Sequence, residues 1–152
     1  MTHIDQDLLL ELQRDLGDLV SAAESLALSY EKCKNIGVKD HYNFEEEESF
    51  DSLSSKFART SDIFTQKVLK TIFLLLRENP KSFIDKANLA EKLEIIPSAD
   101  RLILMRDLRN EIVHEYVASK LSRIYKEVLG QYSNLLDAIV AAKINVQEHG
   151  WY

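Results

Sequence analysis

The sequence predicts an all-α fold, an up-and-down four-helix bundle with an additional short helix, in a single domain spanning residues 1–152. Three observations support this prediction. Apolar residues recur with the helical period of about 3.6 residues over four long stretches. The chain contains only 4 Gly and 2 Pro, which favours long uninterrupted helices. No stretch of β-branched residues alternates over the length of a strand, so no sheet is expected.

The first predicted helix covers residues 5 to about 33, and Gly37 ends it or opens the loop that follows. Residues 38–48 are charged and aperiodic, which indicates a loop. A second long helix is expected over residues 47–78, and the glutamates that precede it favour its start through the helix dipole. Asn79-Pro80 ends this helix, because the residue before a proline disfavours helical geometry.

Two further helices are expected in the next part of the chain. The residues Ser82-Phe83-Ile84-Asp85 resemble a capping box, which opens a short helix to about residue 95. Ile96-Pro97-Ser98 ends it. Ser98 or Asp100 then caps another helix, which is expected to reach about residue 117.

A last helix is expected after Ser119, a residue type suited to an N-cap. The sequence leaves open whether a break at residues 117–119 separates this helix from the preceding one or a single helix continues. Residues 1–4 and 146–152 are expected to be frayed. The apolar seam of the last helix consists of Leu121, Ile124, Val128, Tyr132, Leu135 and Ile139.

The net charge of −6 argues against a general nucleic-acid-binding protein, because phosphate contacts need Lys and Arg. The charge is nevertheless uneven. Residues 101–126 hold six basic and three acidic side chains, whereas the N-terminal fifty residues are the main acidic block. A locally basic segment therefore lies in an otherwise acidic chain.

The sequence also indicates a cellular location. Its single cysteine, Cys33, cannot form an intrachain disulfide, so a reducing cytoplasm is expected, with Cys33 as a half-buried thiol. The first residues carry acids where a signal peptide would carry basic residues. The longest apolar runs, such as residues 72–76, are too short to span a bilayer. We expect a cytoplasmic protein that does not contact a membrane.

The sequence lacks the motifs of phosphate-binding loops and of metal sites. Neither Gly-rich phosphate-binding motif occurs, and one Cys with four scattered His gives no zinc-ligand spacing. His3, His41 and His149 fall in termini or loops, where we expect them to be solvated. The four glutamates at 45–48 are neighbours on a helix and do not converge, so neither a metal nor a cofactor is expected.

Residues 106–116, Arg-Asp-Leu-Arg-Asn-Glu-Ile-Val-His-Glu-Tyr, place a charged side chain on an apolar helix face. On a helical projection Arg109 and Tyr116 fall within the apolar stripe, whereas Asn110 and His114 lie on the polar side. Because Arg is almost never buried without a partner, Arg109 requires an ion pair, an interface or a ligand. The stripe consists of Leu102, Met105, Leu108, Ile112 and Val113.

Two interpretations of this segment stay open. In the structural one, Arg109 pairs with a core-facing acid from another helix, His114 is a surface residue and Tyr116 packs in the core. In the functional one, His114 moves a proton from a ribose 2′-OH, Arg109 binds the phosphate through its planar fork, and Asn110 orients the imidazole or a substrate oxygen. Arg109 and His114 point about 140° apart on an ideal helix, so one helix aims both at one phosphate only if the arginine wraps round or the helix bends. A two-fold dimer would let both groups line one cleft.

Residues 109–116, Arg-Asn-Glu-Ile-Val-His-Glu-Tyr, resemble the R-x4-H-x-Y signature of HEPN domains, specifically the HepT-like and nucleotidyltransferase-substrate-binding branches. Residues 49–72 also resemble the second helix of that group. The resemblance covers most of the chain and is weakest over residues 79–97 and the tail. It implies a HEPN-like helical bundle that forms a homodimer, with a metal-independent ribonuclease site at the subunit cleft.

By the same resemblance, Arg109, Asn110 and His114 match the catalytic positions of the family. Tyr116 matches the tyrosine that, in HepT-like toxins, a cognate nucleotidyltransferase antitoxin modifies with AMP. The expected function is an RNA-cleaving toxin of a toxin–antitoxin pair. One alternative is a non-catalytic partner that presents nucleotide or substrate to a nucleotidyltransferase, and another is a helical scaffold with an accidental motif. The basic residues expected to bind RNA are Arg106, Lys120 and Arg123.

Overall fold

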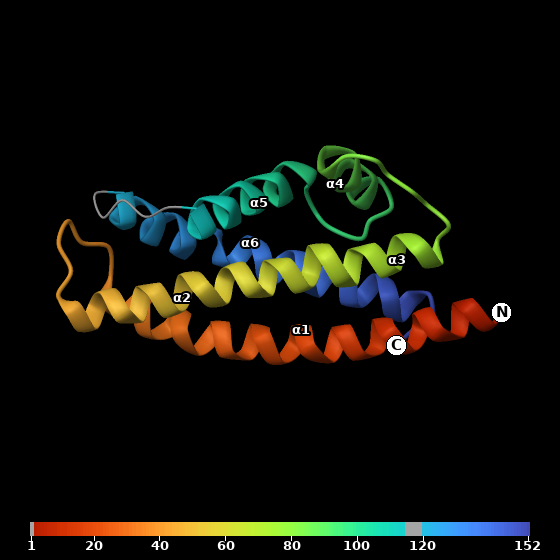
Figure 1. Ribbon diagram of the computed structural model, residues 1–152, viewed down its shortest axis with the longest axis horizontal. Helices are drawn as coiled ribbons and strands as arrows, with labels where there is room; N and C mark the ends of the chain where they lie inside the picture. Colours follow the sequence, from red (N-terminus) through yellow and green to blue (C-terminus); the bar gives the residue numbers. More distant parts are fainter. Residues whose placement is uncertain (1, 115–119) are drawn as a thin grey trace.

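The computed structural model of the protein describes residues 2–114 and 120–152, which form helices joined by turns and loops (Figure 1). These two ranges contain no strand, so the all-α prediction is confirmed. The helical elements are α1 (His3–Ile36), α2 (Phe44–Asp62), the π-helical segment η1 (Ile63–Val68), α3 (Leu69–Leu75), α4 (Phe83–Lys92), α5 (Ala99–His114) and α6 (Leu121–Glu148).

The helices pack side by side into an elongated bundle (Figure 1). After α1 and the loop that follows it, the chain returns beside α1 as α2, η1 and α3. The short α4 lies at the end of the bundle near α3, α5 runs back over α2, and α6 returns through the bundle. None of the helices described has the length and apolar character that crossing a membrane requires.

Two capping boxes correct the expected starts of α1 and α2. The Thr2 hydroxyl accepts a hydrogen bond from the Asp5 N–H at 3.1 Å, and the Asp5 carboxylate accepts one from the Thr2 N–H. The start of α1 is therefore capped rather than frayed. Asn43 and Glu46 exchange the same pair of bonds, which starts α2 at Phe44, three residues earlier than expected. The loop before α2 is correspondingly shorter.

The expected capping box of α4 is present, with the Ser82 hydroxyl accepting from the Asp85 N–H at 3.0 Å. The helix ends three residues before the expected end. Glu94 then adopts a left-handed φ of +59°, and the Ile95 N–H donates to the Ala90 carbonyl at 2.8 Å. This arrangement satisfies one of the carbonyls that a helix end leaves without a partner.

The second long helix of the prediction contains a π-helical segment. α2, η1 and α3 follow one another without a break, and the run ends at Leu75, a few residues early. Arg77, with a φ of +58°, then turns the chain out of the helix. π-Helical turns are rare and frequently occur at functional sites. Here η1 begins directly after Asp62, which belongs to the site described below.

α5 and α6 are separate helices that pack together and run in opposite directions (Figure 1). The Ser98 hydroxyl accepts from the Arg101 N–H at 3.2 Å, so Ser98 caps α5. α6 begins at Leu121. The sequence left open whether one helix or two cover this part of the chain, and the structure has two. Ser119, the expected cap of the last helix, lies outside the described residues.

The expectation of a frayed C-terminal segment is wrong. α6 extends to Glu148, and Val146 is fully buried. Trp151 packs against the core. Its backbone N–H donates to the Val146 carbonyl at 3.1 Å, and its backbone carbonyl accepts from Gln13 Nε2 at 3.2 Å. The partly buried Trp151 side chain, the buried Val146 and the hydrogen bond to Gln13 hold the segment against the bundle.

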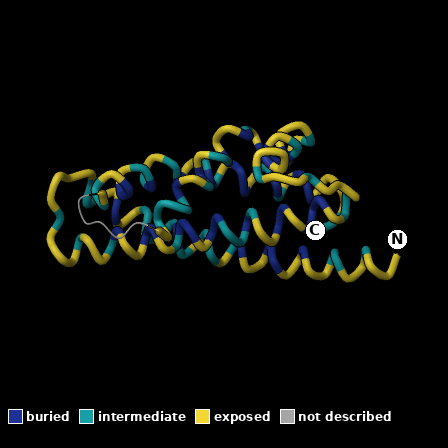
Figure 2. The backbone as a smooth tube through the Cα atoms, turned by 45° about the horizontal axis from the view of Figure 1, so that its top comes forward, coloured by how far each residue is buried: buried dark blue, intermediate teal, exposed yellow. Residues whose placement is uncertain are grey.

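The core runs along the inside of the bundle, where the buried stretches of the helices face one another (Figure 2). Leu16 of α1, Phe57 of α2 and Tyr125 of α6 are among its largest side chains. Cys33, expected to be half-buried, is fully buried, and this burial raises the pKa of its thiol. Cys33 therefore behaves as a small apolar packing residue.

Asp15 of α1 is a carboxylate that is only 6% exposed. Burial and the nearby Glu11 raise its pKa, and Lys67 and Arg14 oppose this shift. The pKa of Asp15 is therefore higher in the folded protein than in the unfolded chain. With respect to this group, the folded state is most stable below the ordinary carboxylate pKa, where the buried carboxyl is protonated and uncharged. That stability is lost as the pH rises through the folded-state pKa.

Asp15→Asn is therefore expected to raise the melting temperature near pH 7 by about 2–4 °C, the shift that roughly 1 kcal/mol produces in a chain of this size. The gain should shrink as the pH falls through the raised pKa of Asp15, because the protonated carboxyl is neutral like the amide. Thermal unfolding across this pH range measures it. Glu24→Gln, which neutralises an exposed carboxylate on the same helix, is the control. A gain that does not depend on pH would contradict this account.

Candidate active site

α5 is held in the bundle by Leu102, Met105 and Leu108, each at most 2% exposed. The later residues of the predicted apolar stripe are less buried, since Ile112 is half-buried and Val113 is 39% exposed. The last turn of α5 is therefore less buried than the periodicity indicated. This places the polar residues of the motif near the surface.

Arg109 has the partner that its position requires. Its Nε and Nη2 donate to the two carboxylate oxygens of Asp62, at 2.7 and 2.9 Å, in a bidentate ion pair between α5 and the end of α2. The Arg109 and Asp62 side chains are 25% and 31% exposed. Arg109 is thus paired with an acid from another helix, as the structural interpretation expected, but the pair lies at the edge of the core.

The ion pair leaves part of the guanidinium available. Arg carries five N–H donors, of which two bind Asp62 and one, on Nη1, binds Asn110 Oδ1 at 3.2 Å. Two N–H groups remain without a partner among the described residues. The hydrogen bonds to Asp62 raise the pKa of Arg109 above its ordinary value, so the guanidinium stays charged. A fixed, charged group with two spare donors can bind a phosphate.

A pocket of about 440 Å³ lies beside this pair, between α5, α4 and the junction of α2, η1 and α3. Thr65 and Gln66 of the π-helical segment line it, together with Asn110. The pocket has one acidic side chain, Asp62, and four cationic ones. The cationic side chains are Lys70, Lys86, Arg106 and Arg109.

His114 is the last residue of α5 and is exposed. It is not part of the lining of this pocket, whereas Arg109 and Asn110 are. Within one chain, the described residues therefore bring together two of the three predicted catalytic residues and leave His114 apart. Tyr116, the predicted modification site, lies outside the described residues.

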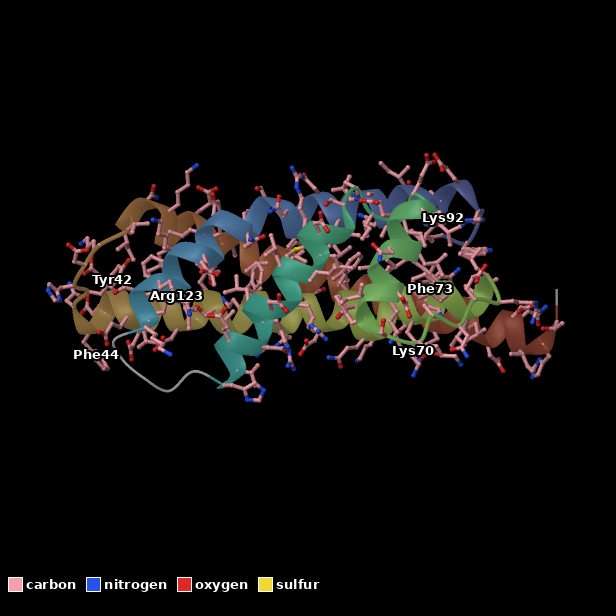
Figure 3. All side chains as sticks on the ribbon, turned by 90° about the horizontal axis from the view of Figure 1, so that it is seen from above. Tyr42, Phe44, Lys70, Phe73, Lys92 and Arg123 are labelled. Atoms are coloured by element: carbon pink, nitrogen blue, oxygen red, sulfur yellow. The ribbon has the colours of Figure 1, made fainter. Side chains whose placement is uncertain are left out.

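The predicted RNA-binding residues have different surroundings. Arg106 places its guanidinium over the Phe83 ring, 4.6 Å from the ring centroid, and lines the pocket. Arg123 lies toward the other end of the bundle from Lys70 (Figure 3) and forms ion pairs with two glutamates of α5 and α6. Its charge is thus balanced by its neighbours. Lys120 directly precedes α6.

Sequence reasoning did not find Asp62 or the two lysines of the pocket, Lys70 and Lys86. Asp62 and Arg109 are 47 residues apart, so only the packing of α5 on α2 shows that they pair. The one local signal was an acid directly before the apolar pair Ile63-Phe64 on the second predicted helix. The lysines carried no signal, because exposed lysines are normal on any helix.

Comparisons of the chain with protein-family models, with curated proteins and with solved structures found no match. Over residues 2–114 and 120–152, no three His, Cys, Asp or Glu side chains are grouped so that they could hold a metal ion. The site provides an oriented guanidinium and an amide, and the exposed imidazole of His114 lies outside it at the end of the same helix.

Proposed function

We propose that the protein is a metal-independent endoribonuclease of the HEPN type, an up-and-down four-helix bundle that acts as a homodimer in the cytoplasm. The observation that carries this proposal is the geometry of Arg109. Its guanidinium is fixed by Asp62 and keeps two N–H donors beside a solvent-open pocket. His114, on the same helix, supplies an imidazole, the side chain best suited to proton transfer near neutral pH.

In the proposed reaction the ribose 2′-oxygen attacks the adjacent phosphorus while His114 accepts the 2′-OH proton. The bond from phosphorus to the 5′-oxygen of the next nucleotide breaks, and that oxygen takes the proton from the imidazole of His114, which the first step protonated. Arg109 stabilises the negative charge that develops on the phosphoryl oxygens. The products are a 2′,3′-cyclic phosphate and a 5′-hydroxyl, and the reaction needs no metal ion.

A homodimer would bring together Arg109 and His114, which one chain leaves apart. Arg109 lines the pocket, whereas His114 lies at the end of α5 and outside it. Two copies related by a two-fold axis beside α5 would place His114 of one chain near Arg109 of the other. Leu104 and Val113, apolar side chains that are 53% and 39% exposed on α5, would then be covered by the interface.

The proposal includes a regulating partner. In a toxin–antitoxin pair, a cognate nucleotidyltransferase would transfer AMP to Tyr116, two residues after His114. The added phosphate would repel the RNA phosphate from Arg109 and inactivate the nuclease. This part of the proposal rests on the sequence signature alone.

A second candidate function is a non-catalytic subunit that presents a nucleotide to a separate nucleotidyltransferase. The pocket beside Arg109 favours it, since about 440 Å³ is within the usual size range of small-ligand sites. Its four cationic side chains would suit the phosphates of a nucleotide.

The purified protein is expected to cleave total RNA in the presence of EDTA and to leave 2′,3′-cyclic phosphate ends. His114→Ala should reduce the cleavage rate by at least about 100-fold, the usual effect of a general acid–base group. Gel electrophoresis with end-group analysis measures both results. His41→Ala, which removes an exposed loop histidine, is the control and should cleave normally.

Cleavage that needs Mg²⁺, or that persists in His114→Ala, would contradict the ribonuclease proposal. No cleavage by the wild-type protein, combined with tight binding of ATP or AMP, would support the second candidate function instead.

A further inference from the structure

The pocket beside Arg109 continues into a second one. A neighbouring pocket of about 310 Å³ shares Thr65, Lys70 and Lys86 with it and extends to Lys81, in the segment between α3 and α4. We call the combined surface the cationic groove. Its cationic side chains are Lys70, Lys81, Lys86, Arg106 and Arg109.

The lining of the cationic groove carries more positive than negative charge. Five cationic side chains line it against two carboxylates, Asp62 and Glu78, in a chain whose net charge is −6. Asp62 pairs with Arg109, and Arg106 forms a long ion pair of 3.8 Å with Asp107. Lys70 also lines a separate pocket that contains Glu11, Asp15 and Asp18. The ammonium groups of Lys70 and Lys86 are exposed and form neither an ion pair nor a hydrogen bond with any described residue.

The cations come from separate parts of the chain, so the fold brings them together. Lys70 belongs to α3, Lys86 to α4, and Arg106 and Arg109 to α5. Figure 3 shows Lys70 at the edge where α3 and α4 meet, and Lys92 on the opposite side of α4, near α6. Like charges gathered in one groove repel each other, and an anionic ligand with several phosphates would relieve this repulsion.

We propose that the cationic groove binds the phosphates of a single-stranded RNA next to the phosphate at Arg109. Lys70 and Lys86 are then binding residues of the ribonuclease, although neither takes part in the chemistry. The inference rests on the proposed function for the nature of the ligand. Five cationic side chains over two pockets that share lining residues can contact more than one phosphate, as a chain of phosphates requires.

The test measures binding of a fluorescently labelled 2′-O-methyl RNA oligonucleotide, which lacks the attacking 2′-OH, by fluorescence anisotropy at several salt concentrations. Lys70→Gln and Lys86→Gln are each expected to lower the slope of log K against log salt by about 0.7, the value for one phosphate contact with a single strand. The double variant should bind at least about tenfold more weakly. Lys92→Gln removes an exposed lysine of α4 outside the groove and should bind like the wild-type protein.

Equal weakening by Lys92→Gln, or unchanged binding by the double variant, would overturn the inference. A second arm titrates ATP into the same variants. Binding of ATP that depends on Lys70 and Lys86, without binding of the oligonucleotide, would also overturn it and assign the groove to a free nucleotide.

The two proposals can fail separately. If the wild-type protein binds the oligonucleotide through the groove but does not cleave RNA, the groove stands and the ribonuclease proposal falls. If RNA is cleaved and the double variant keeps the KM of the wild-type protein, the ribonuclease stands and the groove assignment falls.

Discussion

If the proposed function is correct, Arg109→Ala is expected to lower the rate of RNA cleavage by about 1,000-fold, because it removes the group proposed to stabilise charge on the phosphate. Arg109→Lys should be nearly as inactive, since an ammonium can neither bind Asp62 through two parallel bonds nor present a planar pair of donors. Single-turnover cleavage of a defined RNA measures the chemical step for each variant.

Asp62→Asn extends this prediction to a positioning residue. Asp62 touches no substrate in the proposed site, but its carboxylate fixes the guanidinium of Arg109. The asparagine is uncharged and has one acceptor oxygen, so the guanidinium would turn away from its working position. We expect cleavage to fall by about 10- to 100-fold, because small misplacements of a catalytic group have effects of this size.

The melting temperature of Asp62→Asn should change little, because partly exposed ion pairs contribute little to stability. Asp62→Glu, which restores the charge, should recover part of the activity. Arg101→Ala, an exposed arginine on the first turn of α5, is the control for general loss of positive charge. Full activity of Arg109→Ala, or equal losses for Arg101→Ala, would show that the chemistry lies elsewhere.

Phe57→Ala is expected to lower the free energy of unfolding by about 3–5 kcal/mol. Phe57 lies on the inner face of α2 and is 0% exposed, so truncation to alanine leaves a cavity in the core. A loss of this size is a large part of the roughly 5–15 kcal/mol that stabilises most domains. Urea denaturation followed by circular dichroism measures it.

Phe44→Ala provides a matched control on the same helix. Phe44 lies at the start of α2 near Tyr42 (Figure 3) and is 73% exposed. Its truncation should change the free energy of unfolding by no more than about 0.5 kcal/mol. Similar losses for the two variants would mean that the packing of α2 differs from the structure described here.

The all-α class and the positions of most helices follow from the sequence because their signals are local. The capping box of Ser82 and Asp85 involves residues three apart, and it forms as expected. The predictions are wrong where a short polar or charged stretch begins a helix or packs against the core. The sequence predicts a loop at Glu45 and Glu46, whereas Asn43 caps a helix there. It predicts a frayed end around Trp151, whereas Trp151 packs against the core.

The sequence by itself determined that Arg109 needs a partner, because a charged side chain beside an apolar stripe is unfavourable without one. It could not determine which acid that partner is. Asp62 and Arg109 meet only through the packing of α5 on α2, and the cationic groove likewise combines side chains from α3, α4 and α5. Periodicity and capping act over one or two helical turns, whereas ion pairs and pockets between helices depend on how the helices pack. The tertiary structure therefore decided which charges are balanced and which face an open groove.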